Sequence, residues 1–265
     1  MAAKSPEPTE SPESPPVREE RDAGVVTLTL DSPRNRNALS SALVAGLLDG
    51  LRRAGADPDV RAVVLTHTGG TFCAGADLTE AGSDPGTRTA QMVEVLRAVL
   101  ETPKPVVGSI DGHVRAGGMG LVGACDVVIA GPSSTFALTE ARLGLAPSII
   151  SLTVLPRLTS RAASRLFLSG EKVGAAEAAA YGLITEAADD PSAAIRSLLA
   201  SFRLSSPQGL AETKKLTTAA VLDAFDRRAD ALAADSARLF ASAEAREGMM
   251  AFLEKRPPSW AVVRG

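Results

Sequence analysis

Four short apolar runs recur along the first half of this chain, and helical patterns separate them. The runs cover residues 25–30, 60–66, 105–110 and 127–130. Within the second run, Ala62 to Leu65 are apolar without alternation, as expected for a strand that is covered on both faces. Between the runs, residues 40–56 and 88–101 place apolar side chains at helical spacing, with Ser40 as a candidate N-cap. Strands that alternate with helices predict an α/β core.

The second half of the chain changes to helices. Helical patterns are expected over residues 151–158, 160–168, 175–181, 193–202, 210–243 and 247–254. A chain of 265 residues that is 45% hydrophobic can bury a large core, and its 3% aromatic content requires that core to be aliphatic.

Composition and charge exclude several classes of protein. A net charge of -3, with no basic stripe, predicts no nucleic-acid partner, and no run approaches the roughly 18 apolar residues of a membrane span. Cys73 and Cys125 are too few for a disulfide framework, so a reducing cytoplasm is expected. His67 and His113 lack the spacing of metal ligands, so we expect no metal. Residues 1–22, rich in Pro, Ser and Glu, are expected to form a disordered tail.

Two stretches of small residues follow apolar runs and indicate the chemistry of a site. They cover residues 71–78 and 111–120, and each can present an uncovered backbone N–H where a helix begins. Two such donors directed at one oxygen form an oxyanion hole, where one lost donor typically costs about 10²–10³ in rate. A glycine stretch by itself is more often a tight turn, so the pairing of the two stretches carries this interpretation.

Five blocks of sequence resemble the enoyl-CoA hydratase/isomerase family, also called the crotonase family, from Ala23 to the C-terminus. The blocks cover residues 32–39, 72–78, 112–126, 139–147 and 248–256, in the order and spacing of that family. The resemblance implies an α/β fold, a spiral of ββα units that forms two sheets. It implies a core over residues 23–200 and a helical region over residues 201–265 that is used to form homotrimers or hexamers.

The same resemblance implies the substrate and the reacting groups. The substrate would be an acyl-CoA thioester of fatty acid metabolism, so coenzyme A would enter with the substrate and no cofactor would stay bound. The N–H groups of Ala76 and Gly117 would hold the thioester oxygen, with Gly117 at the positive end of a helix dipole. Glu140 would transfer a proton to or from the acyl chain.

Residues that would contact coenzyme A come from three blocks. The resemblance puts Arg34 near the phosphates and Ala74, Asp77 and Leu78 at the adenine end. Phe252 and Lys255 resemble a C-terminal pair that reaches coenzyme A, often from a neighbouring subunit.

One family glutamate is missing, and this leaves the reaction open. Its position is occupied by Gly120. Hydration needs one group to activate water and another to transfer the α-carbon proton. With one of the two glutamates missing, the site is poorly equipped for the nominal activity, enoyl-CoA hydratase. A single Glu140 suffices for an enoyl-CoA isomerase, or for an acyl-CoA decarboxylase in which Arg115 and Arg142 receive a substrate carboxylate. A non-catalytic coenzyme A-binding or oligomer-forming protein is the third interpretation.

Two further expectations concern single side chains. Arg115 and Arg142 could instead pair with Glu140 or Asp126, and a pair with Glu140 would lower the pKa of that carboxyl. Cys73 is expected to be a small buried residue and not a nucleophile.

Overall fold

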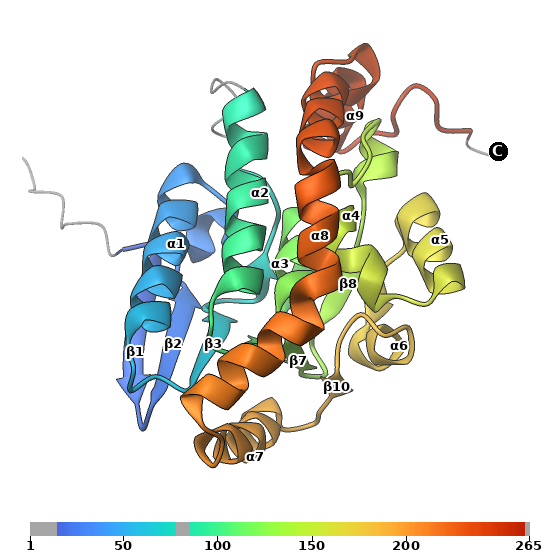
Figure 1. Cartoon of the computed structure of the whole chain (residues 1–265). Coiled ribbons are helices and arrows are strands. Elements are labelled where there is room, and N and C mark those ends of the chain that lie inside the picture. Colours follow the sequence, from blue (N-terminus) through green and yellow to red (C-terminus); the bar gives the residue numbers. More distant parts are fainter. Residues whose placement is uncertain (1–14, 78–84, 263–265) are drawn as a thin grey trace, which may run out of the picture.

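The computed structural model describes residues 15–77 and 85–262, and its strands form two sheets (Figure 1). Among the described residues the larger sheet has the strand order β1-β2-β3-β5-β7-β10, and the smaller has the order β4-β6-β8-β9. The strands of the larger sheet are β1 (Val17–Asp22), β2 (Val25–Leu30), β3 (Ala62–His67), β5 (Val106–Ile110), β7 (Val127–Ala130) and β10 (Glu186–Ala187). Those of the smaller sheet are β4 (Thr71–Cys73), β6 (His113–Arg115), β8 (Thr135–Ala137) and β9 (Val173–Gly174).

Three consecutive pairs of strands build both sheets at once. In each of the pairs β3–β4, β5–β6 and β7–β8 the first strand joins the larger sheet and the second joins the smaller one. Within each sheet these strands are parallel to one another, so β4, β6 and β8 all end at the same edge. The crotonase-type α/β fold expected from the resemblance is confirmed, and its second sheet delivers three loops to one place.

The helices confirm the expected alternation, with small shifts at their ends. The longer ones are α1 (Ser41–Ala56), α2 (Pro85–Glu101), α3 (Gly117–Ala124), α5 (Ser160–Ser169), α7 (Pro191–Arg203), α8 (Pro207–Phe240) and α9 (Ala243–Leu253). The shorter ones are α4 (Ser151–Val154), α6 (Ala175–Ala180) and the 3-10 turns η1 (Pro33–Asn35), η3 (Glu140–Leu143) and η4 (Leu155–Arg157).

Proline and serine explain where several helices begin or end. Pro191 and Pro207 occupy the first turns of α7 and α8, which therefore start earlier than expected from the apolar pattern. Ser242 accepts a hydrogen bond from the Ala245 N–H at 3.1 Å, so the last helix begins before residue 247. The helix expected over residues 151–158 is interrupted, and its second half is the 3-10 turn η4 that contains Pro156.

Helices cover both faces of the larger sheet. Figure 1 shows α1, α2 and α8 side by side over one face, and side chains from these helices share one buried cluster with Val63 and Leu65 of β3. Ala62 and Val64 of the same strand pack in a second cluster under α7. The strand is therefore covered on both faces, as expected from an apolar run without polar alternation.

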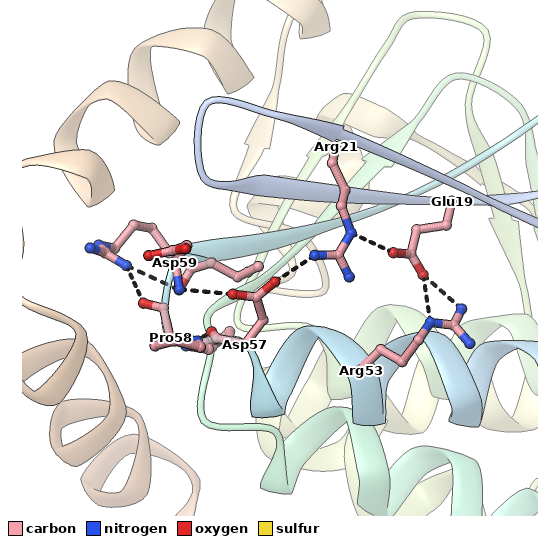
Figure 2. Close-up of polar contacts among 9 residues, drawn as sticks. Glu19, Arg21, Arg53, Asp57, Pro58 and Asp59 are labelled. Atoms are coloured by element: carbon pink, nitrogen blue, oxygen red, sulfur yellow. Dashed lines mark hydrogen bonds and ion pairs between the residues drawn. The ribbon is translucent and has the colours of Figure 1, made fainter.

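The expected disordered tail over residues 1–22 is wrong for its last six residues, and residues 1–14 lie outside the described part. Residues 17–22 form β1, which pairs antiparallel with β2 along its whole length. Figure 2 shows how its charges are used: Arg21 lies between Glu19 and Asp57, at 2.8 and 2.5 Å, and Glu19 also pairs with Arg53 of α1 at 2.7 Å. Such a charged edge strand resists pairing with a further strand.

Two features of the described residues bear on the other expectations. No helix within residues 15–77 and 85–262 combines the length and apolar character needed to cross a membrane, and these ranges hold no group of three His, Cys, Asp or Glu side chains suited to a metal ion. The expected boundary between residues 200 and 201 falls inside α7, and Val221 and Phe225 of α8 belong to the main core cluster. The division into a core and a C-terminal region stays a prediction.

Candidate active site

The loops that follow β4 and β6 touch each other through glycine. A methyl group built on Gly75 would lie 2.7 Å from the Ala116 Cβ and 3.1 Å from the Gly117 nitrogen. Gly75 also has a φ of +94°, in the region that glycine adopts most readily. Any other residue at this position would separate the two loops.

Ala116 turns the chain sharply at the start of α3. Its φ of 45° and ψ of -120° are costly for a residue with a side chain, by about 1–3 kcal/mol. The strained turn leads directly into Gly117, the first residue of α3, whose N–H has no acceptor within the helix because it belongs to the first turn. Strain of this kind, kept at the positive end of a helix dipole, is typical of a functional site.

The Ala76 amide lies in the neighbouring loop. The Leu39 N–H donates to the Gly75 carbonyl at 2.7 Å, and Leu39 and Ala76 form an isolated parallel bridge. Within the described residues, neither the Ala76 nor the Gly117 amide meets an acceptor in another element. The two amides therefore lack such an acceptor within that part of the chain, on two loops that are in contact.

Glu140 reaches the same edge at the end of the third strand. It starts η3, three residues after Ala137, which pairs with Arg115 of β6. Its side chain is 9% exposed, and its Oε2 atom has no hydrogen-bond partner among the described residues. Burial raises the pKa of Glu140 to about 7, against the partial compensation of a hydrogen bond to its own backbone. A buried carboxyl that is near half-ionised at neutral pH can both accept and return a proton.

Apolar side chains fill the space beside Gly120. A methyl group built there would lie 2.6 Å from Ile150 Cγ2 and 3.2 Å from Leu96 Cδ1. Both side chains are almost wholly buried. A longer side chain at this position would require Ile150 to move, and α3 carries no carboxyl side chain.

Comparison with known proteins gives this geometry a context. A family model described as enoyl-CoA hydratase/isomerase matches residues 20–262. The chain belongs to the enoyl-CoA hydratase/isomerase family. The family acts on thioesters of coenzyme A.

Similar proteins carry different activities in their names. An enoyl-CoA hydratase from Mycobacterium avium has a crystal structure that superposes with a TM-score of 0.89 at 58% identity, covering 94% of this chain and 100% of that chain. An Escherichia coli 1,2-epoxyphenylacetyl-CoA isomerase is 34% identical over 251 residues, covering 90% of this chain and 95% of the relative. An enoyl-CoA hydratase of Mycobacterium tuberculosis is 31% identical over 252 residues, covering 91% of this chain and 94% of the relative.

Two of the three blocks expected to contact coenzyme A in this family lie together. Arg34 is exposed in η1, and its neighbour Asn35 donates to the Asp77 carboxylate at 2.9 Å. The Ala74 N–H donates to the carbonyl of Arg36 at 3.2 Å, so the same block reaches the start of the loop. Leu78 lies outside the described residues.

Phe252 and Lys255 come from a different element. Phe252 is 59% exposed near the C-terminal end of α9, and Lys255 follows the helix with a φ of 55°. Among the described residues, neither is joined by a hydrogen bond or an ion pair to the loops described above.

The two arginines near the site do not pair with Glu140. Arg115 donates to the Val114 and Thr135 carbonyls, both at 2.7 Å, and to the Thr135 hydroxyl. Arg142 donates twice to the Ser169 carbonyl, at 3.0 and 2.8 Å. A lowered pKa of Glu140 through Arg115 is therefore wrong: without an opposing charge, desolvation raises it.

Sequence reasoning did not assign a role to Asn37, which organises the loops. Its side chain is fully buried, donates to the Thr68 and Thr71 carbonyls at 3.0 and 2.7 Å, and accepts from the Ser32 N–H at 2.7 Å. Its φ of 53° suits asparagine better than most residues.

Cys73 is a buried residue, as expected. It is fully covered, and burial raises the pKa of its thiol to about 12. The thiolate that a nucleophile requires is therefore scarce at neutral pH.

Proposed function

We propose that this chain is an acyl-CoA isomerase of its family, one that moves a double bond between the β,γ and α,β positions of an enoyl-CoA thioester. The observation that carries the proposal is the buried carboxyl of Glu140, together with a glycine at position 120 whose surroundings Ile150 and Leu96 fill. Moving a double bond needs one base, whereas adding water needs a second group to activate the water.

In the proposed reaction, Glu140 removes a proton from the α-carbon of a β,γ-unsaturated thioester. The electron pair of that C–H bond moves onto the thioester oxygen, where the Ala76 and Gly117 N–H groups stabilise the enolate. Glu140 then returns the proton to the γ-carbon, where the electron pair of the former β,γ double bond forms the new C–H bond. The C=C pair of the enolate becomes the α,β double bond, and the electrons on the oxygen re-form the carbonyl. The pKa of Glu140, about 7, supports both directions of transfer.

The side chains around α3 support an apolar acyl group. A methyl group built on Gly117 would lie 2.6 Å from Met92 Cε and 3.1 Å from Leu39 Cδ1, and Gly120 faces Ile150 and Leu96. These neighbours offer hydrocarbon surface and no groups to orient a water molecule.

The residues expected at coenzyme A remain part of the proposal: Arg34, Ala74, Asp77, Leu78, Phe252 and Lys255. Self-association as a homotrimer or hexamer is also proposed, and the exposed apolar side chains of Met250, Phe252, Leu253 and Trp260 support it. A cytoplasmic location stays a prediction from the cysteine content.

Decarboxylation has less support, because the guanidinium groups of Arg115 and Arg142 already donate hydrogen bonds to protein carbonyls.

The test is incubation with a β,γ-unsaturated acyl-CoA, with chromatographic separation of the products. We expect the α,β-unsaturated isomer without net formation of the β-hydroxyacyl product. Glu140→Gln should lower the rate by about 10²–10⁴, since it removes the proton carrier. The matched control, Glu186→Gln on the exposed strand β10, should leave the rate unchanged.

Accumulation of the β-hydroxyacyl product would make the chain a hydratase and overturn the proposal. Equal turnover by the Glu140→Gln variant would remove Glu140 from the reaction. Binding of acyl-CoA without any turnover would leave the non-catalytic interpretation.

A further inference from the structure

The backbone of the turn that carries Glu140 is closed by its own hydrogen bonds. The Glu140 carbonyl accepts from the Gly144 N–H and from the Leu145 N–H, the latter at 2.9 Å. Gly144 has a φ of +70° and ends the turn. The backbone from which the Glu140 side chain extends is therefore fixed within η3 and moves with the turn as a unit.

Helix α9 packs on this turn with its backbone. A methyl group built on Gly248 would lie 2.5 Å from the carbonyl carbon and oxygen of Leu143. One built on Gly144 would lie 2.7 Å from the carbonyl carbon of Glu244 and 2.9 Å from the Ala245 nitrogen. Since no side chain at these points can rotate away, a methyl group must displace one backbone from the other.

The turn is also joined to another helix through Arg142. Its Nε and Nη2 atoms both donate to the Ser169 carbonyl, at the C-terminal end of α5. The guanidinium thus joins η3 to α5, while Gly248 joins it to α9. The turn is held between two helices that are distant in sequence.

The chain beyond α9 closes back on that helix. Arg256 donates both terminal nitrogens to the Glu247 carboxylate, at 2.7 and 2.9 Å, and the Ser259 N–H donates to the same carboxylate at 2.8 Å. On the inner side of α9, Ala245 and Ala251 are buried beside Gly248. The face of α9 that contacts η3 therefore consists of small buried residues. The segment after the helix is hydrogen-bonded to Glu247 and holds the C-terminal end of α9 in place.

We propose that Gly248 is a positioning residue, which lets α9 lie directly on η3 and thereby keeps the carboxyl of Glu140 in its buried place. Gly248 has no role in the chemistry itself and acts through Glu140. The inference rests on the proposed function only in so far as Glu140 is the proton carrier.

The test is Gly248→Ala, with the protonation of Glu140 followed by infrared difference spectroscopy and Glu140→Gln used to assign its band. We expect the Glu140 pKa to fall from about 7 toward its ordinary value of 4.5, because a displaced turn admits water to the carboxyl. The kcat should fall by about 10²-fold with KM little changed, since a displaced group is misaligned in the transition state.

The matched control is Gly50→Ala in α1, where the three atoms nearest to the added methyl group all belong to the Leu28 side chain, the first at 2.7 Å. It should lower Tm without changing the Glu140 titration or kcat. The inference is overturned if Gly248→Ala behaves in the same way as this control. Should Gly248→Ala fail to fold, Glu247→Gln loosens the same helix without added volume, and an unchanged titration in that variant overturns the inference as well.

Failure of the proposed function gives a different result. If no acyl-CoA is turned over by the native protein, yet Gly248→Ala still lowers the Glu140 pKa, the positioning role stands and the proposed reaction is wrong.

Discussion

At the scale of single residues, the carboxyl of Glu140 occupies a place that opposes folding. Its pKa of about 7, against an ordinary 4.5, corresponds to roughly 3 kcal/mol that favours the protonated form. No opposing guanidinium relieves this cost, because Arg115 and Arg142 are bonded to neutral oxygens. A carboxyl kept in such a place at a cost to stability is typical of catalysis.

Glu140→Gln should therefore stabilise the protein at neutral and higher pH. Below about pH 4.5 both folded and unfolded states of the native protein hold the proton, and the carboxyl has no pH-dependent effect. Between about 4.5 and 7 only the unfolded state releases it, so native stability falls, and above 7 the loss is complete at up to roughly 3 kcal/mol. Glutamine does not titrate and avoids this loss.

Urea unfolding of both proteins at about pH 5 and about pH 8 measures the difference. We expect the free energy of unfolding of the variant to increase relative to that of the native protein as the pH rises. A gap that stays constant, or that narrows, would contradict the burial of an unpaired Glu140.

At the scale of elements, Lys214 fastens the long helix α8 to the core. Its side chain is 5% exposed, and its ammonium group donates to the Val99 and Lys104 carbonyls at 2.8 and 3.0 Å and lies 2.8 Å from the Asp126 carboxylate. Val99 belongs to the last turn of α2, so one lysine joins α8 to α2 and to the turn before β7. Desolvation lowers the pKa of Lys214, and the Asp126 carboxylate opposes that effect.

Lys214→Met should lower the free energy of unfolding by about 3–5 kcal/mol, because it leaves the Asp126 carboxylate without its cation and two carbonyls without a donor. Lys215→Met is the matched control, since that side chain is exposed and pairs only with Glu212 on the helix surface. Equal effects of the two substitutions on the urea midpoint would contradict the role given to Lys214.

At the scale of the whole molecule, the hydrophobic pattern of the sequence predicted those helices and strands that are long enough to show a period. The four apolar runs and most helices are found where they were expected, since burial on one or both faces imposes a period on the sequence. The strands β4, β6 and β8 have three residues each, too few to show a period. Residues 17–22, of which all but Val17 are charged, form a strand because the backbone of β2 pairs with them and nearby residues supply opposite charges.

The site was predictable in part for the same reason. Glycine and small residues after apolar runs indicated the two loops, and the family resemblance indicated Glu140. The filling of the Gly120 space by Ile150, the contact of Gly248 with η3 and the raised pKa of Glu140 all arise between segments distant in sequence. Such contacts leave no local pattern in the sequence, so they are seen only in the three-dimensional structure.

The central claim, an enolate held by two amides and formed by Glu140, is tested most directly by hydrogen exchange on a saturated acyl-CoA in heavy water. A saturated chain has no double bond to move or hydrate, so loss of the α-carbon proton reports the enolate step alone. The account predicts deuterium at the α-carbon with the native protein, and a rate lower by about 10²–10⁴ with Glu140→Gln. Exchange that is equally fast in the variant, or absent from a native protein that binds the thioester, would contradict it.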